Sequence, residues 1–148
     1  MPRMGHNFQM SFNAPAPFPL SRPRRLRRDR SPRNLVREHR LSAHDFIYPV
    51  FVHEGQNLRQ AVTSMPGVDR LSLDLLLPVA EDCVKLGIPV LALFPSIDTS
   101  LKTPDGKEAL NSDGLIPRVV RALKQEFPAL GVMTDVALDP YTSHGQDG

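Results

Sequence analysis

The sequence predicts an α/β fold in which buried parallel strands alternate with amphipathic helices. Three short apolar runs start at positions 46, 88 and 130, and two segments with apolar residues at helical spacing lie between them. Runs that carry apolar residues at nearly every position are typical of strands buried on both faces. The order strand, helix, strand, helix, strand indicates a βαβαβ unit.

The three predicted strands cover residues 46–52, 88–94 and 130–136. Pro49 and Pro89 fall inside the first two of these runs. Because proline lacks an amide hydrogen, it favours the edge or the start of a strand. We therefore expect these two strands to lie at an edge or to start near their prolines.

The first predicted helix connects the first two strands. Ser72 or Asp74 has a side chain that can cap its start, and Gly87 is placed to end it. Pro78 fits only within about the first turn, where the backbone amides lack partners inside the helix. This condition places the start of the helix near residue 74.

The second predicted helix connects the last two strands. Polar side chains at 111–113 can cap its start, and Pro117 then falls in its first turn. Its apolar residues recur at the helical spacing: Leu115, Ile116, Val119, Val120, Leu123 and Phe127.

The first 40 residues differ from the rest in composition and charge. Positions 1–23 hold five prolines, and positions 21–40 hold nine arginines against two acidic residues. Positions 41–148, in contrast, hold fourteen acidic and eight basic residues. We expect residues 1–40 to form an irregular arm that packs only against a partner surface, with a short helix at 34–38.

Composition also narrows the class of protein. The single cysteine, Cys83, excludes an internal disulfide and any cysteine-cluster zinc site, and it is expected to be a small buried residue. No apolar stretch approaches the roughly 18 residues that cross a bilayer, and the start lacks a signal pattern. We expect a cytoplasmic protein with no membrane contact.

Two architectures fit a βαβαβ unit. A doubly wound nucleotide-binding sheet would carry a glycine-rich turn after its first strand, and the segment 52–56, VHEGQ, has none. The alternative is a (β/α)8 barrel, which takes about 250 residues. Since three strands do not close a barrel, we expect residues 41–148 to be an incomplete barrel of about three βα units, ending in the loop after the third strand.

The loop after the third strand concentrates polar side chains. Asp135 closes the strand, and Asp139, Tyr141, His144 and Asp147 follow it. Carboxylates are hard oxygen donors that suit magnesium, calcium or manganese, although the spacing is not that of an EF-hand. The alternative is a solvated polar loop whose side chains only hold turns.

The segment 135–148, DVALDPYTSHGQDG, resembles the metal loop of the porphobilinogen synthase family, also called delta-aminolevulinic acid dehydratase. Other segments resemble that family in the same order: RPRRLR at 22–27, LVRE at 35–38, IYPVFV at 47–52, SMPGVDRLS at 64–72 and LFP at 93–95. The resemblance spans residues 21–148. It implies a (β/α)8 barrel with an N-terminal arm that embraces a neighbouring subunit in a homo-oligomer such as an octamer.

The resemblance also implies an activity. Members of this lyase family condense two molecules of 5-aminolevulinate into porphobilinogen with loss of water, in tetrapyrrole (heme) biosynthesis. Zinc-type members carry cysteines where this chain has Ala137, Asp139 and Asp147, and a histidine where it has Gln146. The chain therefore resembles the aspartate-rich, magnesium-associated type, and we expect no zinc at this loop.

Two groups of site residues follow from the resemblance. Asp139 and Asp147 are the candidate ligands of magnesium, or they orient the substrate. Asp135, Ser143 and His144 are expected to support the substrate site through hydrogen bonds. His53 and Glu54 lie on the same side of the predicted sheet, but we expect them to be ordinary surface groups.

No catalytic residue is assigned, because the family's chemistry resembles Schiff-base mechanisms that need a lysine of lowered pKa. The chain has four lysines, and none ends a predicted strand: Lys85, Lys102, Lys107 and Lys124. We expect the paired lysines beyond Gly148, so this chain alone should form no porphobilinogen. The alternatives are a non-catalytic interaction fragment and a basic arm that binds nucleic acid weakly; specific nucleic-acid binding is not expected, since positions 21–40 hold no aromatic residue.

Overall fold

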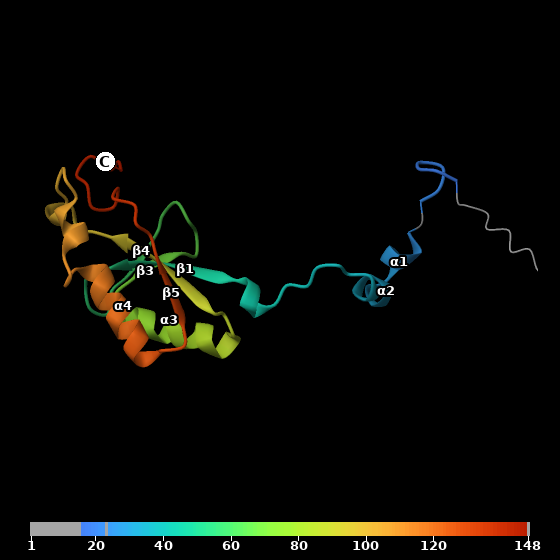
Figure 1. Cartoon of the computed structure of the whole chain (residues 1–148), viewed down its shortest axis with the longest axis horizontal. Helices are drawn as coiled ribbons and strands as arrows, with labels where there is room; N and C mark the ends of the chain where they lie inside the picture. The colour runs from blue at the N-terminus through green and yellow to red at the C-terminus, as the bar shows by residue number, and fades with distance from the viewer. Residues whose placement is uncertain (1–15, 23, 148) are drawn as a thin grey trace, which may run out of the picture. The chain divides into compact units, whose positions relative to one another are not determined.

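A computed structural model describes residues 16–22 and 24–147. These residues divide into two compact units, one ending at Arg40 and the other starting at Leu41 (Figure 1). None of the helices in these residues combines the length and the apolar character needed to cross a membrane.

The first unit contains two short helices, α1 (Arg25–Arg28) and α2 (Arg30–Leu35), and neither buries a residue. Asp29 has an extended backbone and separates them. The helix predicted at 34–38 is therefore misplaced, because the helical residues come earlier. The irregular arm predicted for the start of the chain lies mostly outside the described residues, and residues 16–22 contain no helix or strand.

The second unit is built on a sheet whose strand order is β2-β3-β1-β4-β5. Its three longest strands are β1 (Ile47–His53), β4 (Val90–Ser96) and β5 (Gly131–Thr134), and they run parallel as direct neighbours. These are the three strands that the apolar runs predict, displaced by one or two residues at their starts. Their pairing brings the carboxyl ends of all three to one edge of the sheet.

Two further strands were not predicted. The strands β2 (Arg59–Ala61) and β3 (Asp69–Leu71) pair antiparallel with each other, and β3 runs parallel to β1 at Phe51 and Val52. The sheet is therefore mixed rather than purely parallel. Three-residue strands are too short to show an alternating pattern, so sequence periodicity could not reveal them.

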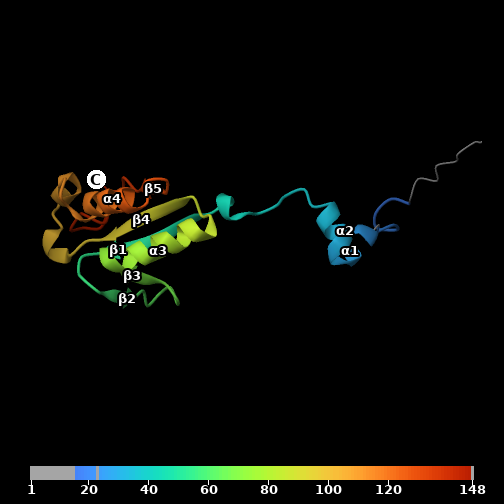
Figure 2. The same cartoon turned by 90° about the horizontal axis from the view of Figure 1, so that it is seen from below.

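Both long helices pack on one face of the sheet. They are α3 (Leu73–Leu86) and α4 (Leu115–Glu126), and Figures 1 and 2 show them beside the strands. The core joins alternate residues of the strands to one stripe of each helix: Val50, Val52, Leu91, Leu93, Leu76, Ala80, Cys83, Leu115, Val119 and Leu123. The prediction that Cys83 is a buried small residue is confirmed.

The opposite face of the sheet is apolar but only partly covered. Phe51 and Phe94 project there from β1 and β4, with ring centroids 5.8 Å apart. Ile47 and Met133 on the same face are 49% and 48% exposed. No helix within residues 41–147 packs over these side chains, so the helices of the second unit cover only one face of its sheet.

The ends of the two long helices agree only in part with the ends predicted from the sequence. Gly87 ends α3 in the left-handed conformation, with φ of 76°, as predicted. At the N-cap positions Ser72 and Gly114, however, no side chain caps the helix, so the predicted capping roles are wrong. The Ser72 hydroxyl is used elsewhere, because it accepts a hydrogen bond from the Leu58 amide at 3.0 Å.

The prolines show which constraints the fold obeys. Pro49 lies in a part of β1 that has one neighbouring strand, β4, because β3 pairs with β1 only at Phe51 and Val52. Pro89 lies immediately before the start of β4. Pro117 lies in the first turn of α4, as expected. Pro78 does not lie in the first turn, because α3 already starts at Leu73. The helix tolerates the lost hydrogen bond because its buried stripe holds it on the sheet.

Replacing Leu123 with alanine should destabilise the second unit, because this fully buried side chain of α4 fills the core between helix and sheet. The expected loss in the free energy of unfolding is about 2–5 kcal/mol. Urea unfolding followed by circular dichroism measures it. Leu86→Ala is the matched control, since Leu86 is 67% exposed on α3 and should cost less than about 1 kcal/mol. Equal losses for the two variants would contradict this assignment of the core.

Candidate functional site

The candidate site lies at the edge where the three parallel strands end. Two segments leave this edge side by side: the β4–α4 loop (residues 97–114) and the terminal loop (residues 135–147) (Figure 1). They are joined by backbone hydrogen bonds. The Thr103 amide donates to the Tyr141 carbonyl at 3.2 Å, and the Ser143 amide donates to the Thr103 carbonyl at 3.0 Å. The two loops therefore form one unit.

A tight turn in the β4–α4 loop lets the terminal loop pack over it. Gly106 has a left-handed backbone with φ of 63°, which favours glycine. A Cβ built there would lie 3.5 Å from Thr142 and 3.7 Å from Tyr141. Thr142 is only 2% exposed, and its hydroxyl donates to the Gln146 carbonyl at 2.9 Å. This buried threonine anchors the terminal loop, and the sequence analysis did not nominate it.

The three aspartates of the terminal loop have different surroundings. One carboxylate oxygen of Asp147 accepts hydrogen bonds from the amides of Leu138, at 2.5 Å, and Asp139, at 3.1 Å. The Asp135 carboxylate accepts one from the Ala137 amide at 2.9 Å, which is a local turn contact. Among the described residues, no hydrogen bond reaches the carboxylate of Asp139. The three carboxylates do not form a common cluster, and no group of three or more histidine, cysteine, aspartate or glutamate residues in the described ranges could hold a metal ion.

His144 also takes part in the contact between the two loops. Its Nε2 lies 3.2 Å from the Pro104 carbonyl, and its Nδ1 accepts from the Gln146 amide at 3.2 Å. Because a carbonyl only accepts, Nε2 is the donor in the first contact and Nδ1 is the acceptor in the second. Ser143, the other predicted supporting residue, is exposed and joins the β4–α4 loop through its backbone. The structure therefore brings Ser143 and His144 to the loop contact and leaves Asp135 in its own turn.

Tyr141 is the terminal loop's contribution to the core. Its ring packs against the apolar cluster. Burial raises the pKa of the Tyr141 phenol above 10.0, and the nearby Glu108 carboxylate raises it further. The phenol is therefore protonated at neutral pH.

The end of β1 brings two more ionisable side chains to this edge. His53 belongs to the strand and is only 9% exposed, with Nε2 3.3 Å from the Leu58 carbonyl. The expectation that it is a surface group is wrong, because β1 extends one residue further than its apolar run and carries His53 inside. Glu54 is half-exposed, and it forms an ion pair with Arg118 of α4.

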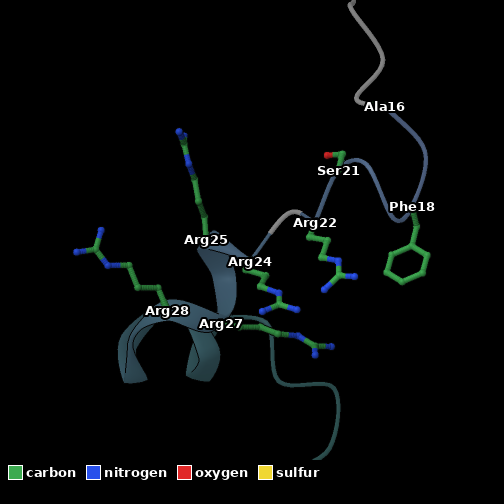
Figure 3. Close-up of a pocket in the computed structure, with 8 residues that line it drawn as sticks. All are labelled: Ala16, Phe18, Ser21, Arg22, Arg24, Arg25, Arg27 and Arg28. Carbon is green, nitrogen blue, oxygen red and sulfur yellow. The ribbon is translucent and has the colours of Figure 1, made fainter.

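The first unit offers a separate, strongly basic surface. An open hollow is lined by Ala16, Phe18, Ser21, Arg22, Arg24, Arg25, Arg27 and Arg28 (Figure 3). The Arg22 guanidinium lies 5.2 Å from the centre of the Phe18 ring, a cation–π distance. Within the described residues, these arginines form one ion pair, a long one of 3.8 Å between Arg28 and Asp29. Clustered positive charge of this kind attracts anionic surfaces without selecting among them.

Comparison with known proteins identifies the family. The family model described as delta-aminolevulinic acid dehydratase matches residues 20–148. The chain belongs to the delta-aminolevulinic acid dehydratase family. The delta-aminolevulinic acid dehydratase of Bradyrhizobium diazoefficiens is 51% identical over 127 residues, which cover 86% of this chain and 36% of the relative. The chloroplastic enzyme of Chlamydomonas reinhardtii is 46% identical over 130 residues, which cover 86% and 33%.

A solved structure agrees with this assignment. The delta-aminolevulinic acid dehydratase (porphobilinogen synthase) of Toxoplasma gondii, crystallised with the reaction product porphobilinogen, matches with a TM-score of 0.81 and 44% identity. The match covers 86% of this chain and 36% of that one. The family predicted from the sequence motifs is confirmed, and the chain spans about a third of the length of the relatives it matches.

Replacing Thr142 with valine should loosen the terminal loop, because it removes the hydroxyl and leaves the Gln146 carbonyl without that hydrogen bond. Limited digestion with chymotrypsin measures this: cleavage after Leu138 and Tyr141 should become several-fold faster, as local opening becomes more frequent. Thr142→Ser keeps the hydroxyl and is the control. Unchanged cleavage in the valine variant would show that the hydroxyl does not hold the loop.

Proposed function

We propose that this chain supplies the N-terminal part of a porphobilinogen synthase subunit, a lyase that condenses two 5-aminolevulinate molecules into porphobilinogen with loss of water in heme biosynthesis. The observation that carries the proposal is the family match over residues 20–148. The likeness to a dehydratase that was crystallised with porphobilinogen supports it. Both comparisons cover only about a third of the relatives' length, so the activity belongs to a longer polypeptide.

The proposal includes the fold of that longer protein. Parallel strands in the order β1, β4, β5, with α3 and α4 on one face, are what consecutive βα units of a (β/α)8 barrel look like. In such a barrel the opposite face is the interior, which accounts for the apolar side chains of Phe51 and Phe94 there. Residues 41–148 then provide about three of the eight units, and residues 1–40 form the arm.

The lysines of this chain do not suit Schiff-base chemistry. The amine of Lys124 donates to two backbone carbonyls, and Lys85 pairs with Glu81 at 2.8 Å. Hydrogen bonding to Glu81 raises the pKa of Lys85, whereas a nucleophilic lysine needs a lowered one. Lys102 and Lys107 lie in the β4–α4 loop, and neither is the last residue of a strand. The reacting amines are therefore assigned to polypeptide beyond residue 148.

The terminal loop is the part of the substrate site that this chain provides. Active sites of barrels lie at the carboxyl ends of the strands, where this loop starts. We assign Asp135, Ser143 and His144 supporting roles, in which they shape the loop and offer hydrogen bonds. The Asp139 carboxylate is exposed and receives no hydrogen bond from the described residues, so it suits the ammonium group of 5-aminolevulinate.

Magnesium remains the predicted metal, and zinc is not expected because the loop has no thiolate. The described residues do not form a magnesium site on their own. Asp139 and Asp147 would be its only carboxylates, and one oxygen of Asp147 already accepts two amide hydrogens. Magnesium prefers six oxygen ligands in near-octahedral geometry. When bound, it would supply positive charge near the loop.

The partners follow from the same proposal. The arm is assigned to contacts within a homo-oligomer, an octamer being the predicted form, and the predicted compartment is the cytoplasm. The arginine-rich surface also favours weak, salt-sensitive binding of nucleic acid through charge alone. A non-catalytic interaction role for the 148 residues is the second alternative.

A chimera tests the function directly. Residues 1–147 of this chain are fused to the part of the Bradyrhizobium diazoefficiens relative that follows its matched segment, and porphobilinogen formation from 5-aminolevulinate is measured colorimetrically. The chimera should form porphobilinogen, while the 148-residue chain alone should form none above the blank. A folded chimera without activity would contradict the proposed function, and turnover by the purified short chain would contradict the assignment of the reacting amines.

A further inference from the structure

The carboxylate of Asp147 closes the terminal loop on itself. It accepts hydrogen bonds from the amides of Leu138 and Asp139, which precede it by nine and eight residues. The Asp135 carboxylate, in comparison, reaches only the amide two residues along the chain. Within residues 135–147, Asp147 is therefore the side chain that joins the beginning of the loop to its end.

These two hydrogen bonds have the character of a strong closure. The acceptor is ionised, and charge-assisted hydrogen bonds are shorter and stronger than neutral ones. The Leu138 contact, at 2.5 Å, is the shorter of the two, and the Asp139 contact is 3.1 Å. The two amides have no other hydrogen-bond partner among the described residues, so losing the carboxylate would leave both dependent on water.

Other contacts give the loop the same shape independently. The Leu138 carbonyl accepts from the amides of Tyr141 and Thr142 at 2.8 and 3.1 Å. The Thr142 hydroxyl donates to the Gln146 carbonyl inside the same ring of residues. The loop is thus tied at its middle by Thr142 and at its two ends by Asp147, and it is anchored to the β4–α4 loop through Thr103.

The same geometry is unfavourable for a cation at this oxygen. Two N–H groups point their positive ends at it, and they use the lone pairs that a metal ion would need. A metal ion bound to this oxygen would have to displace the amide contacts, whereas the second oxygen of Asp147 receives no hydrogen bond from the described residues. The oxygen that forms the clip therefore suits hydrogen-bond donors better than it suits magnesium.

We propose that Asp147 is a positioning residue that clips the terminal loop shut without a metal ion, and that it fixes the backbone from which Asp139 projects. The clip rests on the hydrogen bonds alone. Its relevance to catalysis rests on the proposed function, because only there does the loop belong to a substrate site. Asp147 then acts on the substrate through Asp139 rather than by touching it.

Hydrogen exchange tests the clip without any need for turnover. In the 148-residue chain, the exchange rates of the Leu138 and Asp139 amides are measured by NMR, with the Leu123 amide of α4 as an internal reference. Asp147→Ala should speed exchange at both loop amides at least about tenfold and leave Leu123 unchanged, because two charge-assisted hydrogen bonds are lost. Asp147→Asn should fall between wild type and Asp147→Ala, since its amide oxygen still accepts from both donors but carries no charge.

Controls separate the clip from a metal site. Asp139→Ala is the matched variant, because it removes a carboxylate that receives no hydrogen bond from the described residues, and it should leave the Leu138 rate unchanged. Neither magnesium nor EDTA should alter the wild-type rates. The proposal is overturned if Asp147→Ala has no effect, if Asp147→Asn is as fast as Asp147→Ala, or if protection appears only with magnesium. The exchange rates are measured in the 148-residue chain and do not depend on whether the chimera is active. Failure of the clip and failure of the proposed function are therefore distinguishable.

Discussion

The structure of the second unit depends on one constraint: the two long helices pack on the same face of a sheet whose central strands run parallel. Val50 of β1, Leu93 of β4 and Val119 of α4 share the resulting core. Because parallel strands end at one edge, this packing also decides where the loops gather. The burial of apolar side chains on one face and the clustering of polar loops at one edge are therefore consequences of the same arrangement.

At that edge, most of the polar side chains hold the loops in shape. Hydrogen bonds to backbone groups are formed by the side chains of Thr142, Asp147 and His144, and they fix the terminal loop against the β4–α4 loop. Asp139 is the exception, since its carboxylate receives no hydrogen bond from the described residues. In a site organised in this way, several polar side chains support the loop so that one charged group, the Asp139 carboxylate, is held in a defined place.

The elements that could be predicted from the sequence are those marked by a periodic pattern of apolar residues. The apolar runs predicted β1, β4 and β5, the apolar residues at helical spacing predicted α4, and Gly87 predicted the end of α3. The strands β2 and β3 leave no such trace in three residues each. The single helix predicted at 34–38 overlaps α2 only at residues 34 and 35, and α1 was not predicted. Neither helix buries a residue, so no apolar periodicity marks its position in the sequence. At the site, the residue types were visible but their partners were not, because backbone amides such as that of Leu138 carry no signature in the sequence.

We propose that the face of the sheet bearing Phe51 and Met133 is left open by residues 41–147 and becomes the interior of a barrel in a full subunit. Thiol labelling measures this directly, with Met133→Cys in a background where the one native cysteine is replaced, Cys83→Ala. The account predicts that iodoacetamide modifies residue 133 rapidly in the 148-residue chain, where Met133 is 48% exposed, and slowly in the chimera with the Bradyrhizobium remainder. Slow modification in the short chain, or equal rates in both proteins, would contradict it.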